Sequence, residues 1–473
     1  MEILMNIFTF FTNNILTKPE FFVGLIVLIG YILLGKPWYD SFSGFIKATV
    51  GYMILNVGAG GLVVTFRPIL AGLNGRFSLN AAVIDPYFGL NAVHMALENI
   101  GIVTSFTLMA LLVGFFWNII LVALRKITKL RVLFITGHIM VQQATTATWI
   151  LFFVAPAFRN STGAILVGLL VGTYWAVFSN LTVEATQNLT ENSGFSLGHQ
   201  QMFGVWLTDK IAPKLGKPEQ GMDNIKLPGW MHMFNDNVVA TGTLMLLFFG
   251  TVMAILGEDY MRELDKSFAP IIAFPMYILS KSLMFSVYLS ILMQGVRMFV
   301  SELTESFRGI SEKLLPGVMP GIDCAATYGF APANTVLWGF IIGAIAQFIA
   351  VAGLLIFRSP IMIIPGFVPL FFDNATIAVY ANKRGGMKAA TILPFLCGII
   401  QVLGGAFAVW YFQLYQFGGW HGNIDWSTLW PILGVIIKMS PVSGIVICIV
   451  GMLIIPQIQY LRNKANYWGH VEA

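Results

Sequence analysis

The chain has 473 residues, of which 10% are charged and 57% belong to the apolar set AVILMFWYC. Soluble chains are on average about 25% charged, so this composition excludes a soluble globular enzyme, a coiled coil and a disordered protein, and it predicts an all-α polytopic membrane protein. The net charge of +5 comes from side chains scattered over short loops, a distribution that does not indicate binding to nucleic acid.

Eleven segments are apolar enough to span a membrane, for which about 20 residues are needed. The expected spans, some broken by Gly, Pro or polar residues, are residues 20–36, 44–66, 101–124, 131–155, 163–181, 236–256, 270–300, 334–357, 360–380, 388–412 and 429–456. Residues 1–14 lack the features of a signal peptide and are expected to form a short apolar helix. The loops on one side hold 16 Lys and Arg and those on the other hold 7, which predicts an external N-terminus and a cytoplasmic C-terminus.

The three cysteines, Cys324, Cys397 and Cys448, lie in apolar surroundings, without a C-x-x-C pair or a histidine at metal-binding spacing. They therefore predict small core side chains and neither a disulfide nor a metal site. The sequence also lacks the glycine-rich phosphate-binding patterns of nucleotide-binding proteins. We expect no bound cofactor.

Residues 1–473 are expected to form one integral-membrane domain with a weak inverted repeat over residues 44–155 and 283–380. In each half, a polar-tinged helix is followed by an aspartate, Asp85 or Asp323, then by an apolar span and a broken segment. The matching helices are five spans apart and so cross in opposite directions. In transporters, such repeats place the substrate near the middle of the membrane, between re-entrant or broken helices.

Four segments are too polar or too interrupted to face lipid, so we expect them to line a cavity. The first lies in the fourth span, where Gly137 lets the helix unwind and His138 and Gln142 share one helical face. These side chains donate and accept hydrogen bonds without a fixed charge, which favours a hydroxyl-rich ligand. The alternative is that they only hold helices together.

The second segment, residues 194–201, contains His199 and Gln200. A helix starting at Ser196 or Gly198 would place both side chains in its first turn, where backbone N–H groups favour negative charge. The alternative is an amphipathic hairpin at the membrane surface with an exposed histidine.

The other two segments contain the aspartates of the repeat. Two Pro-Gly pairs in residues 316–321 prevent a continuous helix. Asp323 follows them in apolar company that is costly for a carboxylate, so we expect it to serve the site; as a structural residue it would pair with Arg297 or Lys281. The Asp-Pro-Tyr of residues 85–87 offers a hydroxyl and a ring face, or else forms a purely structural re-entrant turn.

Arg297, Ser301 and Glu305 follow one another at the i, i+4 spacing of one helical face. We interpret this pattern as a salt-bridged helix end at the cytoplasmic face, outside the site.

Six motifs resemble those of the ascorbate-specific enzyme IIC permease of the bacterial phosphotransferase system. In chain order they are Thr136–Met140 with Gln142-Gln143, Gly194–Ser196 with Gly198–Gln201, Lys226–Trp230, Gln294–Val300, Ile322–Ala326 and Ile363–Phe367. The resemblance spans nearly the whole chain. It implies an eleven-span homodimer among the lipids of the inner membrane, each protomer having a substrate-holding core domain and a V-shaped dimerisation domain.

The resemblance also implies uptake of L-ascorbate and its delivery as ascorbate 6-phosphate. The phosphoryl group would come from a separate IIB protein, itself charged by a IIA protein, so this chain would be the transporter component. We expect IIB to dock on the basic segment that holds Lys210, Lys214, Lys217 and Lys226.

The resemblance carries over a set of substrate contacts: Pro86, Tyr87, His138, Ile139, Met140, Val141, Gln142, His199, Gln200 and Asp323. It leaves Asp323 and His199 as the candidates for assisting phosphoryl transfer. At Pro86 we would expect a small polar residue in relatives, so only a backbone contact is implied there. A rival interpretation, an ion-coupled secondary transporter of a sugar-like or polyol solute, fits the inverted repeat and the buried aspartate equally well.

Overall fold

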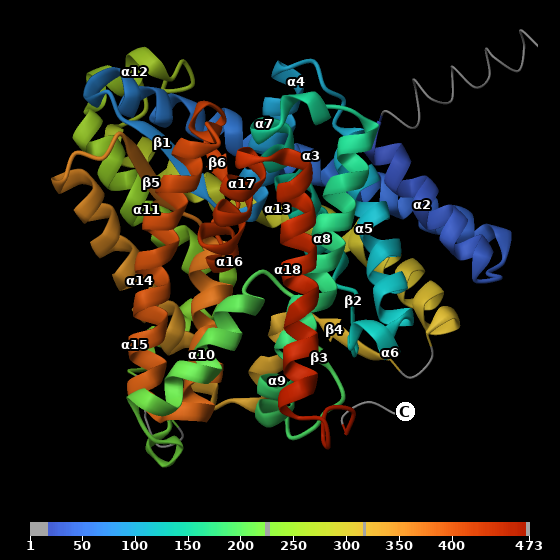
Figure 1. The fold of residues 1–473 in the computed structure, drawn as a ribbon. Helices are drawn as coiled ribbons and strands as arrows, with labels where there is room; N and C mark the ends of the chain where they lie inside the picture. Colours follow the sequence, from blue (N-terminus) through green and yellow to red (C-terminus); the bar gives the residue numbers. More distant parts are fainter. Residues whose placement is uncertain (1–17, 223–227, 316–317, 470–473) are drawn as a thin grey trace, which may run out of the picture.

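The computed structural model describes residues 18–222, 228–315 and 318–469 (Figure 1). Predictions made for residues 1–14, for Lys226 and for Pro316-Gly317 therefore lie outside the described residues. The helices are α2 Pro19–Leu33, α3 Trp38–Phe77, α4 Pro86–Asn99, α5 Ser105–Ala123, α6 Arg125–Thr128, α7 Gly137–Val154, α8 Ser161–Leu181, α9 Val183–Thr190, α10 Met202–Leu215, α11 Asn237–Leu256, α12 Glu258–Leu264, α13 Phe274–Leu314, α14 Ala333–Ile356, α15 Asn374–Tyr411, α16 Ile424–Ser427, α17 Leu429–Met439 and α18 Pro441–Arg462. The strands are β1 Asn80–Ile84, β2 Val132–Phe134, β3 Ser196–Leu197, β4 Met319–Ile322, β5 Ile361–Pro365 and β6 Gly419–Trp420.

Within the described ranges, eight helices are long and apolar enough to cross a membrane. They are α3, α5, α8, α11, α13, α14, α18 and α15 together with the turn before it. The chain is therefore an all-α polytopic membrane protein, as its composition predicts. The first expected span, residues 20–36, forms the shorter helix α2 of 15 residues.

Two of the expected spans begin as strands rather than helices. Residues 131–155 open with β2, and α7 starts only at Gly137, so this glycine begins a helix instead of unwinding one. Residues 360–380 open with β5 and a π-helical turn, Pro369–Asp373. The chain then continues into α15, which is kinked at Gly386 with a φ of 65° and so also contains the next expected span.

The last expected span, residues 429–456, is divided by Ser440 into α17 and α18. Ser440 has an extended backbone, and Pro441 occupies the first turn of α18. A proline there has no N–H to lose and restricts the residue before it to extended conformations, which explains the break.

Two small parallel sheets join distant parts of the chain. One has the strand order β5-β1-β6 and the other β2-β4-β3. In the first, Asn80–Ile84 pair in register with Ile361–Pro365, and in the second, Val132–Phe134 pair with Met319–Gly321. The sheets lie at different heights in the helix bundle (Figure 1). Non-helical backbone at membrane depth must find partners within the protein, and these short ladders provide them.

The order of elements is the same in the two segments predicted to be repeats. A long helix, α3 or α13, leads to a strand, β1 or β4, and then to Asp85 or Asp323, each of which caps the turn that follows it. An apolar helix and a second strand, β2 or β5, come next. That the two segments are inverted copies stays a prediction.

Helices α3 and α13 cross at very short range through glycines. A Cβ added at Gly51 would lie 2.6 Å from the backbone N of Phe299, and one added at Gly295 would lie 2.6 Å from the carbonyl O of Gly51. Small residues permit such close backbone approach between membrane helices. The crossing fixes the height of α13 beside the cavity described next.

Candidate functional site

A cavity of about 400 Å³ lies between α13 and the segments that carry the predicted polar residues. This volume suits a small organic ligand. Its lining consists of Tyr87, His138, Ile139, Gln142, His199, Met293, Val296, Arg297, Ser301, Asp323, Ala325, Val368 and Phe372.

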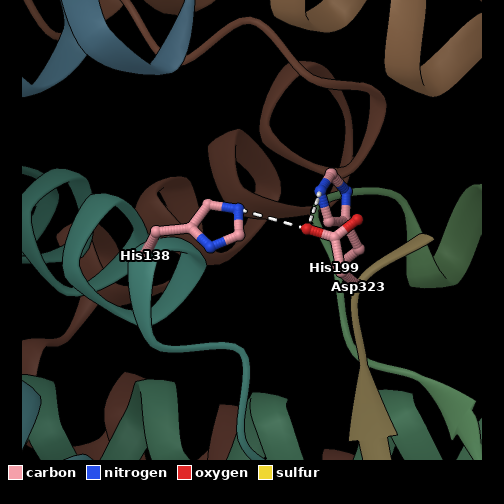
Figure 2. A group of neighbouring side chains, drawn as sticks. All are labelled: His138, His199 and Asp323. Atoms are coloured by element: carbon pink, nitrogen blue, oxygen red, sulfur yellow. Dashed lines mark ion pairs between the residues drawn. The ribbon is translucent and has the colours of Figure 1, made fainter. Parts of the chain in front are cut away.

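Three titratable side chains meet at this cavity (Figure 2). His138 projects from the first turn of α7, His199 from the stretch between β3 and α10, and Asp323 from the end of β4. Oδ2 of Asp323 lies 3.3 Å from Nε2 of His138 and 3.9 Å from Nε2 of His199. Oδ1 accepts a hydrogen bond from the backbone N–H of Ala325 at 2.9 Å. The carboxylate is thus held by the backbone on one side and faces two imidazoles on the other.

The hydrogen bonds around His199 assign its tautomer. The amide nitrogen of Gln201 donates to Thr376 at 3.0 Å, so its oxygen is the acceptor 2.6 Å from Nδ1 of His199. Nδ1 therefore carries the proton in the neutral ring. Nε2 is then left with a lone pair that faces Asp323, and a hydroxyl or a proton between them would relieve the repulsion.

A chain of buried amides orients Gln142. Its side-chain oxygen accepts from Nε2 of Gln200 at 2.6 Å. The oxygen of Gln200 in turn accepts from Gln143 at 2.8 Å and from His421 at 2.7 Å. Because the oxygen of Gln142 is occupied, its NH₂ group is the part left to donate to a ligand.

Asp85 positions one wall of the cavity. It caps α4, with Oδ1 accepting from the backbone N–H of Tyr87, and its Oδ2 accepts from the backbone N–H of Val368, both at 3.0 Å. Tyr87 and Val368 both line the cavity. Asp85 therefore ties the start of α4 to the chain that follows β5.

The ligand atoms of His138, His199 and Asp323 all lie within 4.8 Å of one another. Two imidazoles and a carboxylate are a donor set that Zn²⁺ accepts, although the sequence predicted no metal site. The same three groups also bind hydroxyls, and His138 already lies close enough to Asp323 for a direct ion pair when protonated.

Six of the predicted contact residues meet in the cavity lining: Tyr87, His138, Ile139, Gln142, His199 and Asp323. The other four, Pro86, Met140, Val141 and Gln200, are buried behind it. Pro86 is the first residue of α4, and Gln200, which is 0% exposed, orients Gln142.

Two predictions about local structure at this site were wrong. The helix expected to start at Ser196 or Gly198 begins only at Met202, because Ser196 and Leu197 pair with β4 as strand β3. The exposed-histidine alternative is wrong too, since His199 is 2% exposed.

The proposed structural partners of Asp323 lie elsewhere or make no ion pair with it. Lys281 pairs with Asp265 at 2.6 Å. Arg297, assigned above to a salt-bridged helix end, lines the cavity instead, while Glu305 pairs with Lys36. The i, i+4 pattern was misleading here because Lys36 is far away in sequence. The motif Gln294–Val300 was the available signal for Arg297.

Comparisons with known proteins assign the chain to a family. Residues 14–425 match the family described as "PTS system sugar-specific permease component". The chain is also 33% identical over 441 residues to a Mycoplasma pneumoniae protein named "Ascorbate-specific PTS system EIIC component". That alignment covers 84% of this chain and 66% of the relative, so this chain spans about two thirds of the relative's length. The match over most of the sequence means that the chain belongs to the family of sugar-specific permease components of the phosphotransferase system.

Proposed function

We propose that this chain carries L-ascorbate across the bacterial inner membrane and that a phosphorylated IIB protein, charged by IIA, converts the substrate to ascorbate 6-phosphate. Family membership supports a phosphotransferase permease, and the name of the Mycoplasma relative supports ascorbate. The observation that carries the proposal is the convergence of Asp323, His138 and His199 on one cavity.

The geometry suggests how the acceptor hydroxyl is prepared. Ascorbate is a monoanion at neutral pH, so Asp323 is better placed at its side-chain hydroxyls than beside the charged ring. A hydroxyl there would donate to Asp323 and lie close to Nε2 of His199. As the new O–P bond forms, the bond from phosphorus to the IIB residue breaks and the hydroxyl proton passes to Asp323. His199, held by Gln201, presents the lone pair of Nε2 to the same hydroxyl as a second possible acceptor of its proton.

We also propose an orientation of the chain in the membrane and a docking site for IIB. Helix α6, helix α10 and the last turns of α18 lie at one end of the molecule (Figure 1). That end carries Arg125, Lys126, Lys210 and Lys214, which favours a cytoplasmic location. IIB would dock there, near Lys217. The N-terminus would then be external, and two protomers would form a homodimer through their dimerisation domains, against which the substrate-holding core domain would move.

Uptake by reconstituted vesicles tests the proposal. Vesicles supplied with IIA, IIB and a phosphoryl donor should accumulate ascorbate 6-phosphate, and vesicles without IIB should not. Accumulation of free ascorbate on an ion gradient alone would instead establish the ion-coupled secondary transporter.

A further inference from the structure

Helix α13 contributes a face of its own to the cavity. Met293, Val296, Arg297 and Ser301 line the cavity, at the spacing of one helical face. Arg297 is an exposed side chain, and its Nε donates only a long hydrogen bond, 3.4 Å, to the carbonyl O of Met293 in its own helix. Its other guanidinium N–H groups are directed at no acceptor among the described contacts.

The charge of Arg297 is not neutralised by a neighbouring acid. Within the described part of the chain, no carboxylate lies within ion-pair distance of it. The acids one turn further along α13 are engaged elsewhere: Glu302 accepts from Tyr31 at 2.7 Å, and Glu305 pairs with Lys36. An unpaired arginine inside a membrane helix is costly and is by default a functional residue.

The cavity is therefore polarised. Asp323 lies with His138 and His199 on the side formed by β4 and α7, whereas the positive charge of Arg297 comes from α13 on another side. A ligand that fits this distribution has a delocalised anion at one end and neutral hydroxyls at the other. A guanidinium suits the anionic end, because its planar set of donors can bind two oxygens of a delocalised anion at once.

We propose that Arg297 is a specificity-determining residue that binds the anionic enediol ring of the substrate, so that the side-chain hydroxyls face Asp323. This inference rests on the proposed function, and it explains how a cavity with a carboxylate selects an anion. It also fixes which end of the ligand is phosphorylated. Gly295, two residues before Arg297, packs directly against the backbone of α3. The anion site is therefore part of the α3–α13 pair.

The test compares an anionic with a neutral ligand. L-Ascorbate and L-gulono-1,4-lactone share a carbon skeleton and side-chain hydroxyls, but the lactone lacks the acidic enediol. Equilibrium binding of both would be measured on purified wild-type protein, Arg297→Gln, Arg297→Lys and Arg462→Gln. The last variant removes the same charge from the end of α18, outside the cavity.

Arg297→Gln should weaken ascorbate binding roughly 10- to 100-fold, the usual effect of losing a charge-assisted hydrogen bond, and should change lactone binding less than about threefold. Arg297→Lys should recover part of the loss, which a folding defect would not allow, and Arg462→Gln should bind both ligands as the wild type does. Equal loss for both ligands, or no loss for either, overturns the role of Arg297. Failure of the wild type itself to bind ascorbate would instead overturn the proposed function, and this inference with it.

Discussion

The two oxygens of Asp323 have different surroundings. Oδ1 is held by the N–H of Ala325, whereas Oδ2 faces His138 and His199. The first contact limits rotation of the carboxylate, so the second oxygen stays directed at the cavity. One side chain therefore caps a turn and presents an acceptor to the ligand, and the two roles can be separated by substitution.

Asp323→Asn should keep the cap, because the amide oxygen still accepts from Ala325, but it removes the group that takes the hydroxyl proton. We expect ascorbate binding close to that of the wild type and phosphorylation by charged IIB slowed about 10²- to 10⁴-fold, the range for a lost general base. Single-turnover phosphorylation at saturating ascorbate measures this. A wild-type rate would make His199 the better candidate for the proton acceptor.

Gln142→Ala removes the donor that the buried amide chain orients toward the cavity. A lost hydrogen bond whose partner stays buried costs about 1–3 kcal/mol, so ascorbate binding should weaken roughly 5- to 150-fold. Isothermal titration gives the affinity. Gln457→Ala, which changes an exposed amide on α18, is the control, and an unchanged affinity in Gln142→Ala would remove this side chain from the site.

At the residue scale, the sequence predicts the polar side chains that line the cavity well, but it does not predict the positive charge of Arg297 there. Tyr87, His138, Gln142, His199 and Asp323 stand out because polar side chains in apolar segments need a protein partner or a cavity. Arg297 does not stand out, since its spacing to Ser301 and Glu305 equally fits a helix surface. The ion pair of Glu305 with Lys36, which lies far away in the sequence, leaves Arg297 available for another role.

At the scale of elements, Gly366, which follows β5, packs so closely against the residues before α4 that a side chain would not fit there. A Cβ added at Gly366 would lie 2.9 Å from Oδ2 of Asp85 and closer still to the carbonyl O of Ile84. Gly366→Ala should therefore lower stability by about 1–3 kcal/mol, the usual cost of overpacking. Thermal unfolding in detergent measures the loss. Gly353→Ala, on α14 with no atom within 4 Å of the added carbon, should stay within about 1 kcal/mol of the wild type.

Asp265, in the turn before α13, stabilises the folded protein to an extent that depends on pH. Burial alone would raise the pKa of Asp265, but the Lys281 ammonium, the Tyr277 hydroxyl and Ser267 outweigh it and hold this pKa at about 2. An unfolded aspartate has a pKa of about 3.9. Since the folded value is the lower one, the stabilisation is present above pH 4 or so and is lost as the pH falls through 2.

Asp265→Asn should therefore unfold at a lower temperature than the wild type near neutral pH, and the two should converge as the pH is lowered. Melting temperatures measured across this acid range test the prediction. A difference that stays constant with pH would mean that packing, and not ionisation, is what the substitution disturbs.

The sequence predicts most helices but misses the strands. Val132–Phe134 and Ile361–Pro365 are short apolar runs at the start of expected spans, and hydrophobicity alone does not distinguish a buried strand from the first turn of a helix. Their strand partners, Met319–Gly321 and Asn80–Ile84, lie far away in sequence. Long-range pairing decides these conformations, so no local pattern reveals them.

At the scale of the whole molecule, the tightly crossed helices α3 and α13 should form one body and the substrate-holding core domain another. We expect the two bodies to move relative to each other during transport. Ile139 on α7 and Met293 on α13 line the cavity from these two sides. A protein with cysteines at both positions should lose ascorbate uptake when a short bifunctional maleimide joins them. Each single-cysteine protein, treated in the same way, controls for blocking by the reagent, and full uptake by the cross-linked protein would refute alternating access between these bodies.

The parallel sheets have a consequence for how the protein is made. Strand β1 leaves the ribosome long before its neighbours β5 and β6, so its backbone has no partner while the first half is being inserted. Unpaired backbone groups cost several kcal/mol each in hydrocarbon. The ladder partners of residues 80–84 therefore become available only after residues 361–365 and 419–420 have been synthesised. Biogenesis of the transport site is thus completed after translation of the C-terminal third, and a chain truncated before β5 cannot assemble it.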